Sequence, residues 1–189
     1  MRRAIFGGTF DPIHNAHLAV AKEAASRFRL DTVWLVPAQS PPHKQGVTHA
    51  PYQDRFAMVA LVCQDAPQLE ASRLEEADAS SYSIDTIERV RDLLPAGEEL
   101  FFLIGADAFA EIESWRRWRD VVRAVEFIVV SRPGHIYKIP DGAVVHRLES
   151  VALPVSSSDI RRKLASGDES VDVPATVLEY IRGHGLYRT

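Results

Sequence analysis

Residues 3–17 read RAIFGGTFDPIHNAH, a short apolar strand that runs directly into a glycine pair and then into two histidines. Gly7 and Gly8 allow the backbone to turn with a positive φ and to approach a ligand without a Cβ in the way, as a loop that cradles phosphate oxygens requires. His14 and His17 are three residues apart, so on a helix they share one face and can reach the same anion. The stretch predicts a nucleotide site at a strand-to-helix turn.

Two other interpretations of this stretch compete with a nucleotide site. A zinc site is less favoured, because helical metal pairs usually use positions i and i+4 with a carboxylate or a third ligand nearby. The plain structural alternative is a glycine turn followed by two polar histidines at the start of a helix. This alternative would be favoured for a lone glycine pair or a lone histidine. Here the strand, the glycine pair and both histidines follow one another in the order that a nucleotide site requires.

The size and charge of the chain fit a small enzyme. It has 189 residues, of which 46% are hydrophobic, and this is enough for one sizeable core. We expect a single domain over residues 1–189, with a core at about 1–155 and a C-terminal helical part at about 156–189. The formal net charge is −4, so no basic field draws the chain to nucleic acid or to an anionic membrane. Any affinity for phosphate must be local.

Cysteine content and hydropathy favour a cytoplasmic protein. The one cysteine, Cys63, lies in the apolar helical run 56–63, where a buried inert thiol is expected rather than a nucleophile. No disulfide can form within the chain. A signal-type apolar segment is not visible, and no window approaches roughly eighteen consecutive apolar residues.

Apolar strands and amphipathic helices alternate along the chain. Strands this uniformly apolar indicate burial on both faces, as in a parallel sheet with helices on each side. With right-handed crossovers the pattern predicts an α/β fold, a Rossmann-like doubly wound parallel sheet with a small helical C-terminal elaboration. The expected strands are 4–6, 33–36, a short one near Leu69, 100–104, 127–130, 144–145 and 151–155. The expected helices are about 17–28, 52–63, 84–94, a stretch from Trp115 to Val122, one from the serine run at 156 to a stop at Gly167, and 174–182.

Ligands of such a sheet bind beyond the carboxyl ends of its strands. Four segments with ligand-type residues directly follow expected strands: Gly7 to Gly8, Pro37 to Lys44, Gly105 to Asp107 and Ser131 to Gly134. This clustering predicts that they meet at one edge of the sheet.

The serine run at 155–161 is a second candidate anion site. A run of this kind starts a helix, whose free N–H groups and positive dipole end would face a phosphate. Arg161, about one turn into the helix, can add a bidentate guanidinium contact. Taken alone, the segment is better explained as a helix cap with a solvated arginine.

Three more segments carry side chains suited to a nucleotide. Loop 38–44 contains two prolines and ends in Lys44, so it either closes over a phosphate or is a surface loop with a solvated lysine. Asp107 is expected as a helix N-cap, as the acceptor for a ribose hydroxyl, or as both. Residues 81–86 and 114–115 supply aromatic planes and hydroxyls for a pyridine ring, with core aromatics as the alternative.

The string GGTFDPIH, followed by a histidine three positions on, resembles the nucleotidyltransferases with the HxGH signature and, more narrowly, the bacterial nicotinate-nucleotide adenylyltransferases. The resemblance runs from about Ile5 to Tyr187, where both share a Tyr-Ile-x-x-x-Gly-Leu-Tyr ending. One departure is visible, because the family has glycine where this chain has Ala16. The added methyl would narrow the nucleotide site.

The resemblance implies an enzyme that moves AMP from ATP to nicotinate mononucleotide and forms deamido-NAD and pyrophosphate in NAD biosynthesis. It implies that ATP contacts Gly7, Gly8, Thr9, Phe10, His14, His17, Gly105, Asp107, Ser156, Ser158, Ile160 and Arg161. It implies that nicotinate mononucleotide contacts Gly8, Lys44, Tyr82, Ser83, Trp115 and Arg132.

The expected mechanism relies on positioning and charge. A nucleophile paired with a base does not stand out, and none is required, since the attacking phosphate has a second pKa of about 6 and is largely ionised at pH 7. The protein must hold two polyanions in line and offset charge on the α-phosphate and on the leaving pyrophosphate. The expected catalytic residues are His14, His17, Lys44 and Arg161. Mg²⁺ is the expected cofactor, bound mainly through ATP phosphates and water.

Two alternative functions remain open from the sequence. A sister transferase, such as phosphopantetheine adenylyltransferase or an enzyme that makes a CDP-alcohol, shares the glycine and histidine elements but should lack the Pro-Pro-His-Lys loop and the Ser-Tyr-Ser segment. A non-catalytic nucleotide sensor would bind ATP yet tolerate loss of His14 or His17. The full set of cationic groups at both phosphate elements favours an enzyme, and the sequence sets no oligomeric state.

Overall fold

Six parallel strands form one sheet at the centre of the computed structural model, which describes residues 1–40, 48–78, 81–149 and 155–188. The strands are β1 (Arg2–Gly8), β2 (Thr32–Pro37), β3 (Leu69–Ala71), β4 (Glu99–Gly105), β5 (Glu126–Ser131) and β6 (Val145–Glu149). Their order across the sheet is β3-β2-β1-β4-β5-β6, and every neighbouring pair is parallel. The chain therefore winds outward in both directions from β1, so the sheet reverses its winding between β1 and β4.

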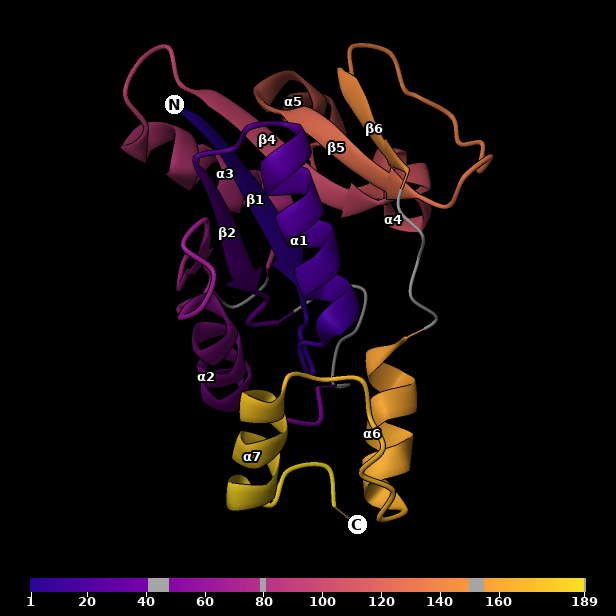
Figure 1. Cartoon of the computed structure of the whole chain (residues 1–189). Helices are drawn as coiled ribbons and strands as arrows, with labels where there is room; N and C mark the ends of the chain where they lie inside the picture. The colour runs from indigo at the N-terminus through magenta and orange to yellow at the C-terminus, as the bar shows by residue number, and fades with distance from the viewer. Residues whose placement is uncertain (41–47, 79–80, 150–154, 189) are drawn as a thin grey trace.

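Helices cover both faces of the sheet (Figure 1). They are α1 (Asn15–Arg27), α2 (Tyr52–Cys63), α3 (Ser83–Leu93), α4 (Ala106–Ala110), the short 3₁₀ helix η2 (Ile112–Ser114), α5 (Trp118–Ala124), α6 (Ser157–Ala165) and α7 (Ala175–His184). Within the described ranges, no helix has the length and apolar character needed to cross a membrane. The predicted doubly wound α/β fold is confirmed.

Alternate residues of each strand point to opposite faces, which explains why the strands are apolar throughout. Ala4 and Phe101 join the core cluster beneath α1, α2, α6 and α7. Their neighbours Ile5 and Phe102 join the second cluster, beneath α3, α4 and α5. β1 and β4 thus supply both cores, whereas β3 contributes only to the first.

The C-terminal helices are part of the first of these cores. Ile160 and Leu164 of α6, together with Val177 and Ile181 of α7, are buried in the same cluster as the apolar faces of α1 and α2. Figure 1 shows α6 and α7 beyond the carboxyl ends of β1 and β2. This placement brings the end of the chain to the edge of the sheet where ligands bind.

Several elements differ from their predicted bounds. The expected strand at 144–145 is the start of β6, while the expected strand at 151–155 lies outside the described residues except for Val155, which is not in a strand. Helix α1 begins two residues earlier than expected. The predicted helical stretch from Trp115 is interrupted, because Arg117 has a left-handed φ of 51° and α5 begins only at Trp118.

Candidate functional site

A cavity of about 210 Å³ opens at the carboxyl edge of the sheet, where its winding reverses between β1 and β4. Five of the predicted site residues line it: Gly7, Gly8, Ser83, Gly105 and Trp115. They come from the end of β1, the start of α3, the end of β4 and the segment after η2. The structure thus brings together residues that are about a hundred positions apart in the sequence.

The glycine pair does not form the turn that the sequence predicted. Gly7 and Gly8 are the last two residues of β1, and neither has a positive φ. The left-handed residue is instead Phe10, with a φ of 48°. Gly8 is required for space, because a Cβ at this position would lie 2.9 Å from two atoms of the Phe10 ring. The prediction of a positive φ was therefore wrong, and the close approach is to Phe10.

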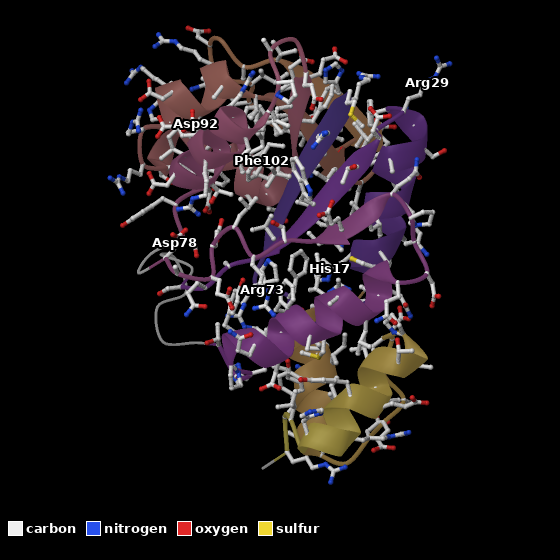
Figure 2. The ribbon with its side chains drawn as sticks, turned by 90° about the vertical axis from the view of Figure 1, so that its left-hand side faces the viewer. His17, Arg29, Arg73, Asp78, Asp92 and Phe102 are labelled. Carbon is white, nitrogen blue, oxygen red and sulfur yellow. The ribbon has the colours of Figure 1, made fainter. Side chains whose placement is uncertain are left out.

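Phe10 holds the imidazole of His17 in place. Its side chain is 2% exposed, and its ring packs edge-on against His17 at 5.1 Å and against Phe6 at 5.6 Å between ring centroids. In the view of Figure 2, His17 lies between the ribbon of the sheet and that of α2. Phe10 is therefore a packing residue that orients His17.

The two histidines stack on one another at the start of α1. Their ring centroids are 3.7 Å apart and their planes differ by 20°. His14 is the N-cap residue, and its backbone N–H donates to Nδ1 of His17 at 3.3 Å. Because Nδ1 accepts this bond, a neutral His17 carries its ring hydrogen on Nε2 and can donate it to a ligand. Both rings also lie at the positive end of the α1 dipole.

His14 differs from the expectation that it supplies positive charge. It is 5% exposed, and its Nδ1 has no hydrogen-bond partner among the described residues. Burial lowers the pKa of His14 to about 4, although the carboxylate of Asp172 acts in the opposite direction. At pH 7 the ring is neutral, so it offers a hydrogen bond rather than a charge.

The start of α6 lies against the loop between β1 and α1. Ser156 is the predicted N-cap, and its Oγ accepts a hydrogen bond from the backbone N–H of Asp159 at 3.1 Å. Ser157 Oγ donates to the carbonyl of Pro12 at 3.0 Å. Arg161 donates to the carbonyl of Asp11 at 2.7 Å. The two predicted anion sites therefore meet in the folded chain.

Two of the predicted ATP contacts in α6 are engaged within the protein. Ser158 Oγ accepts from Arg161 at 3.2 Å, which orients the guanidinium. Ile160 is 3% exposed, and its amide donates to the carbonyl of Ser156 at 3.1 Å. The side chain of Ile160 thus anchors α6 in the core.

Asp107 is not the cap of α4, contrary to one of its expected roles. Gly105 is the N-cap residue, and Asp107 lies in the first turn with its side chain exposed. A carboxylate in the first turn is still favourable, because it faces the positive end of the helix dipole.

The predicted residues for the pyridine ring lie around the start of α3. Tyr82 is the N-cap residue, and the Arg116 guanidinium lies over its ring at 4.7 Å from the centroid. Ser83 begins the helix and lines the cavity beside Trp115, whose ring packs edge-on against Phe102 at 6.0 Å.

Two predicted contacts of nicotinate mononucleotide fall elsewhere. Arg132 follows β5 and is exposed, and it does not line the cavity as far as the described residues show. Lys44 and the rest of the predicted loop from Pro41 lie outside the described residues.

Sequence reasoning missed two buried charged residues that hold the loops of the site together. Asp11 is 2% exposed, and its carboxylate accepts from the backbone N–H groups of His49 at 2.7 Å and Ala50 at 3.1 Å. Arg55 is 1% exposed and donates to the carbonyls of Thr9 at 2.7 Å and of Ala38 at 2.8 Å. The signal for Arg55 was present, since an arginine interrupts the otherwise apolar face of α2.

Burial shifts the acidity of Arg55 in one direction and a neighbouring charge shifts it in the other. Desolvation lowers the pKa of the guanidinium, while the nearby Asp11 carboxylate raises it. Because carbonyl oxygens accept the N–H groups of the guanidinium, the buried Arg55 stays charged. It ties the β1–α1 loop to the segment that follows β2.

Glu75 is a third missed residue, and it lines the cavity itself. It is 6% exposed, and its carboxylate accepts from Thr86 Oγ1 at 2.6 Å. Burial raises the pKa of Glu75, although the hydrogen bonds from Thr86 and Ser81 oppose this. The carboxyl group is therefore a weaker acid than an exposed glutamate.

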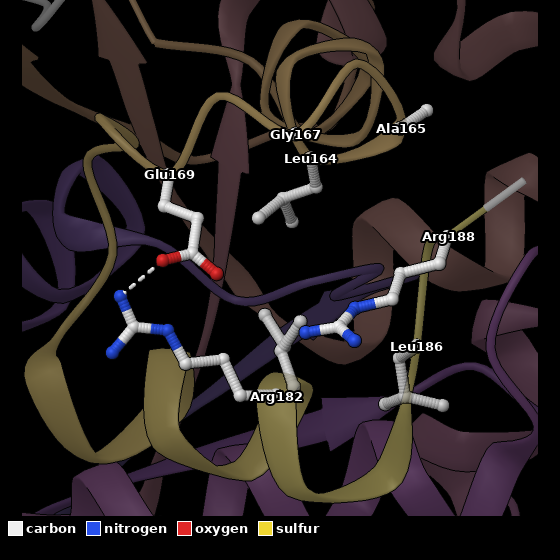
Figure 3. A pocket seen from close by; sticks show the side chains of 8 residues that line it. Leu164, Ala165, Gly167, Glu169, Arg182, Leu186 and Arg188 are labelled. Atoms are coloured by element: carbon white, nitrogen blue, oxygen red, sulfur yellow. Dashed lines mark hydrogen bonds and ion pairs between the residues drawn. The ribbon is translucent and has the colours of Figure 1, made fainter.

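A second pocket, of about 270 Å³, lies between α6 and α7 and is shown in Figure 3. It is lined by Leu164, Ala165, Gly167, Glu169, Ile181, Arg182, Leu186 and Arg188. Arg182 pairs with Glu169 across it. None of the predicted site residues lines this pocket, so the cavity at the end of β1 and β4 is the candidate active site.

Comparison with known proteins identifies the family of the chain. The cytidylyltransferase-like family model matches residues 5–163. A protein of Solibacter usitatus named "Probable nicotinate-nucleotide adenylyltransferase" is 61% identical over 187 residues, which cover 99% of this chain and 100% of the relative. A protein of the same name from Exiguobacterium sibiricum is 39% identical over 193 residues and covers 100% of both chains.

Solved structures show the same fold. The Plasmodium falciparum nicotinic acid mononucleotide adenylyltransferase complexed with NaAD superposes with a TM-score of 0.79 at 21% identity, over 98% of this chain and 97% of that one. The same parasite protein complexed with APC gives a TM-score of 0.80 at 20% identity. Together with the full-length relatives, the family model shows that the chain belongs to the cytidylyltransferase-like family and, within it, to the nicotinate-nucleotide adenylyltransferases.

Proposed function

We propose that this chain transfers the adenylyl group of ATP to nicotinate mononucleotide and releases pyrophosphate, using the site at the ends of β1 and β4. The observation that carries the proposal is the meeting of the two anion-binding elements. Ser157 and Arg161 of α6 donate to the carbonyls of Pro12 and Asp11, directly before the stacked histidines. Full-length relatives named for this activity support the same substrates.

We assign the phosphates of ATP to the space between the start of α1 and the start of α6. His17 can donate from Nε2, and the first turn of α6 adds N–H groups that have no partner within the helix. Arg161 is one turn into α6 and can add a charged contact. Gly105 and Asp107, at the start of α4, are assigned to the adenosine, with the exposed carboxylate as acceptor for a ribose hydroxyl.

We assign nicotinate mononucleotide to the cavity at the ends of β1 and β4. Trp115 supplies an aromatic wall, and Ser83 opens α3 against the cavity. The free N–H groups and positive dipole end of α3 favour a carboxylate over a neutral amide at this point. We assign the stacking and hydroxyl contacts to Tyr82, Ser83 and Trp115, and the phosphate contacts to Gly8 and Lys44. Arg132 is not among the described residues that line the cavity and is given no contact.

The reaction needs no general base from the protein. A phosphate oxygen of nicotinate mononucleotide attacks the α-phosphorus of ATP, and the bond from that phosphorus to the bridging oxygen of the leaving pyrophosphate breaks. His17 donates a hydrogen bond to charge that develops on the α-phosphate, while Arg161 and Lys44 balance the remaining negative charge. The neutral ring of His14 supports His17 by stacking and offers a further hydrogen bond.

The residues of the site fit a magnesium ion that enters with ATP. Among the described residues, no group of three or more His, Cys, Asp or Glu side chains is placed to hold a metal ion. The donors at both phosphate elements are N–H and hydroxyl groups, which bind phosphate rather than Mg²⁺. Mg²⁺ held by ATP oxygens and water would neutralise phosphate charge.

An assay of pyrophosphate release tests the proposal. The purified chain is given ATP and Mg²⁺ with nicotinate mononucleotide, nicotinamide mononucleotide or phosphopantetheine in turn. We expect the highest kcat/KM with nicotinate mononucleotide. Equal values for the acid and the amide would refute the preference for the carboxylate. Faster release with phosphopantetheine would indicate a sister transferase, and ATP binding without release from any substrate would indicate a sensor.

A further inference from the structure

Four side chains link the last part of the chain to the loop between β1 and α1. Two of them are the Ser157 and Arg161 contacts already described. Asp172 accepts from the side-chain amide of Asn15 at 2.6 Å, and its carbonyl accepts from the Asn15 backbone N–H at 3.2 Å. Tyr187 donates from its hydroxyl to Oδ1 of Asp11 at 2.7 Å. Residues 11–15, which include His14 and run into the start of α1, are therefore held from the far end of the sequence.

The Tyr187 contact reaches the most buried of these loop residues. Asp11 receives its other two hydrogen bonds from the backbone N–H groups of residues 49 and 50. The His49 imidazole lies 3.6 Å from Oδ2, beyond hydrogen-bond distance, so Tyr187 is the one side-chain donor to Asp11 among the described hydrogen bonds. Burial first, and the Asp11 carboxylate second, raise the pKa of Tyr187. The hydroxyl therefore stays protonated and remains a donor at neutral pH.

The backbone after α7 is shaped to deliver this hydroxyl. Gly185 ends α7 in the left-handed region with a φ of 63°, and the N–H of Leu186 donates back to the carbonyl of Ile181 at 3.0 Å. Tyr187 itself has a φ of 61°, which a residue with a side chain adopts rarely. Two left-handed positions, separated by Leu186, turn the chain back toward Asp11.

Displacement of Asp11 would reach the catalytic histidines directly. The ring of its neighbour Phe10 packs on His17, with 5.1 Å between the ring centroids. The backbone carbonyl of Asp11 accepts a hydrogen bond from Arg161 at 2.7 Å. His14 follows three residues later in the same loop.

We propose that Tyr187 is a positioning residue for adenylyl transfer, because its hydroxyl holds buried Asp11 and thereby fixes the loop that aims His14, His17 and Arg161 at the phosphates of ATP. The inference rests on the proposed function for its kinetic consequence. Its structural consequence, an ordered loop at residues 9–17, is independent of the substrate.

The chain offers a matched control in Tyr180. Its hydroxyl lies on the same terminal segment and donates to a carboxylate, Oδ1 of Asp54 in α2, at 2.9 Å. The Y180F and Y187F variants thus each remove one tyrosine-to-aspartate hydrogen bond between the end of the chain and the body of the protein. Only Y187F removes one that reaches the β1–α1 loop.

The experiment compares Y187F, Y180F and wild type as full chains, by steady-state kinetics and by amide hydrogen exchange. We expect Y187F to lower kcat/KM for ATP by about tenfold or more, as loss of a hydrogen bond to a charged group predicts. Its KM for nicotinate mononucleotide should stay within about twofold of wild type, and Y180F should leave both parameters within about twofold. Between the two tyrosine variants, exchange in residues 9–17 should accelerate in Y187F alone. The D11N variant, which weakens the acceptor of the Tyr187 bond together with that of the His49 and Ala50 N–H bonds, should accelerate this exchange at least as much.

Equal behaviour of Y187F and Y180F in either measurement would overturn the proposal, because general stability would then explain both. So would a loss of activity in Y187F without faster exchange at residues 9–17. If the wild type releases no pyrophosphate with any substrate, the proposed function fails, and the exchange comparison still decides whether Tyr187 holds the loop. If Y187F does not fold, exchange at residues 9–17 in D11N that is no faster than in Y180F would overturn the proposal.

Discussion

The contrast between the two glycines of β1 gives a sharp prediction about packing next to the phosphate site. A Cβ at Gly8 would lie 2.9 Å from two atoms of the Phe10 ring and 3.2 Å from a third. A Cβ at Gly7 would meet only Cζ of Phe102, at an ordinary 3.9 Å. Phe10 cannot swing away freely, because it is 2% exposed and its ring packs on both Phe6 and His17.

The size of the effect follows from comparing G8A with G7A. Each substitution restricts the unfolded chain and so gains a similar stability of about 0.4–1 kcal/mol, which cancels in the comparison. What remains is the overpacking at Phe10, which costs about 1–3 kcal/mol. We therefore expect the free energy of unfolding of G8A to lie about 1–3 kcal/mol below that of G7A.

Equilibrium unfolding in urea measures this difference directly, with equal slopes for the two variants showing that the unfolding transition is unchanged. Adding F10L to G8A should restore part of the lost stability, because the smaller side chain makes room for the methyl group. Stabilities of G7A and G8A within about 0.5 kcal/mol of each other would refute the packing account of the glycine pair.

Two further predictions concern titratable groups whose pKa is shifted by burial. Burial lowers the pKa of His14 to about 4 in the folded chain, whereas an unfolded histidine has a pKa of about 6.5. Stability that is fully present above pH 6.5 is therefore lost as the pH falls toward 4, because only the unfolded state takes up the proton. Between pH 7.5 and pH 5, wild type should lose about 2 kcal/mol more unfolding free energy than H14Q, and an identical pH dependence in the two would contradict a buried neutral ring. Burial also raises the pKa of the Cys63 thiol to about 11, so iodoacetamide at pH 7.5 should label the native chain far more slowly than the chain unfolded in urea. Equal labelling rates would contradict this.

Much of the fold could be predicted from the sequence because its signals are local. The apolar runs of β1, β2, β4 and β5 mark strands buried on both faces, and the amphipathic segments between them mark crossover helices. Parallel strands bring their carboxyl ends to one edge, so residues at or after the ends of β1, β2 and β4 meet there as expected, whereas the described residues 131–134 after β5 do not line the cavity.

The rest of the site depends on contacts between residues far apart in the sequence. Asp11 and Tyr187 are separated by 176 positions, so no local pattern links them. Arg55 and Glu75 look like ordinary charged residues until tertiary packing buries them. The charge state of His14 was predicted wrongly for the same reason, because its burial arises only in the folded chain.

Local geometry accounts for the other errors. The glycine pair was assigned a positive φ, but β1 continues through Gly8 and the left-handed turn falls at Phe10. Asp107 was expected as a cap, yet the helix begins at Ala106, two residues earlier than such a cap requires, and Gly105 is the N-cap residue. Helix boundaries of this kind shift by a residue or two without any change in composition.

Turnover of the H17A and R161A variants tests the assignment of the phosphate site most directly. With saturating ATP, Mg²⁺ and nicotinate mononucleotide, each variant should show a kcat lower than wild type by roughly 10²-fold or more, the scale expected when a donor to transition-state charge is removed. The free energy of unfolding of each variant, measured in urea, should lie within about 1 kcal/mol of the wild-type value, so that the loss of turnover reflects the reaction and not folding. Near-normal turnover in both variants would contradict the site.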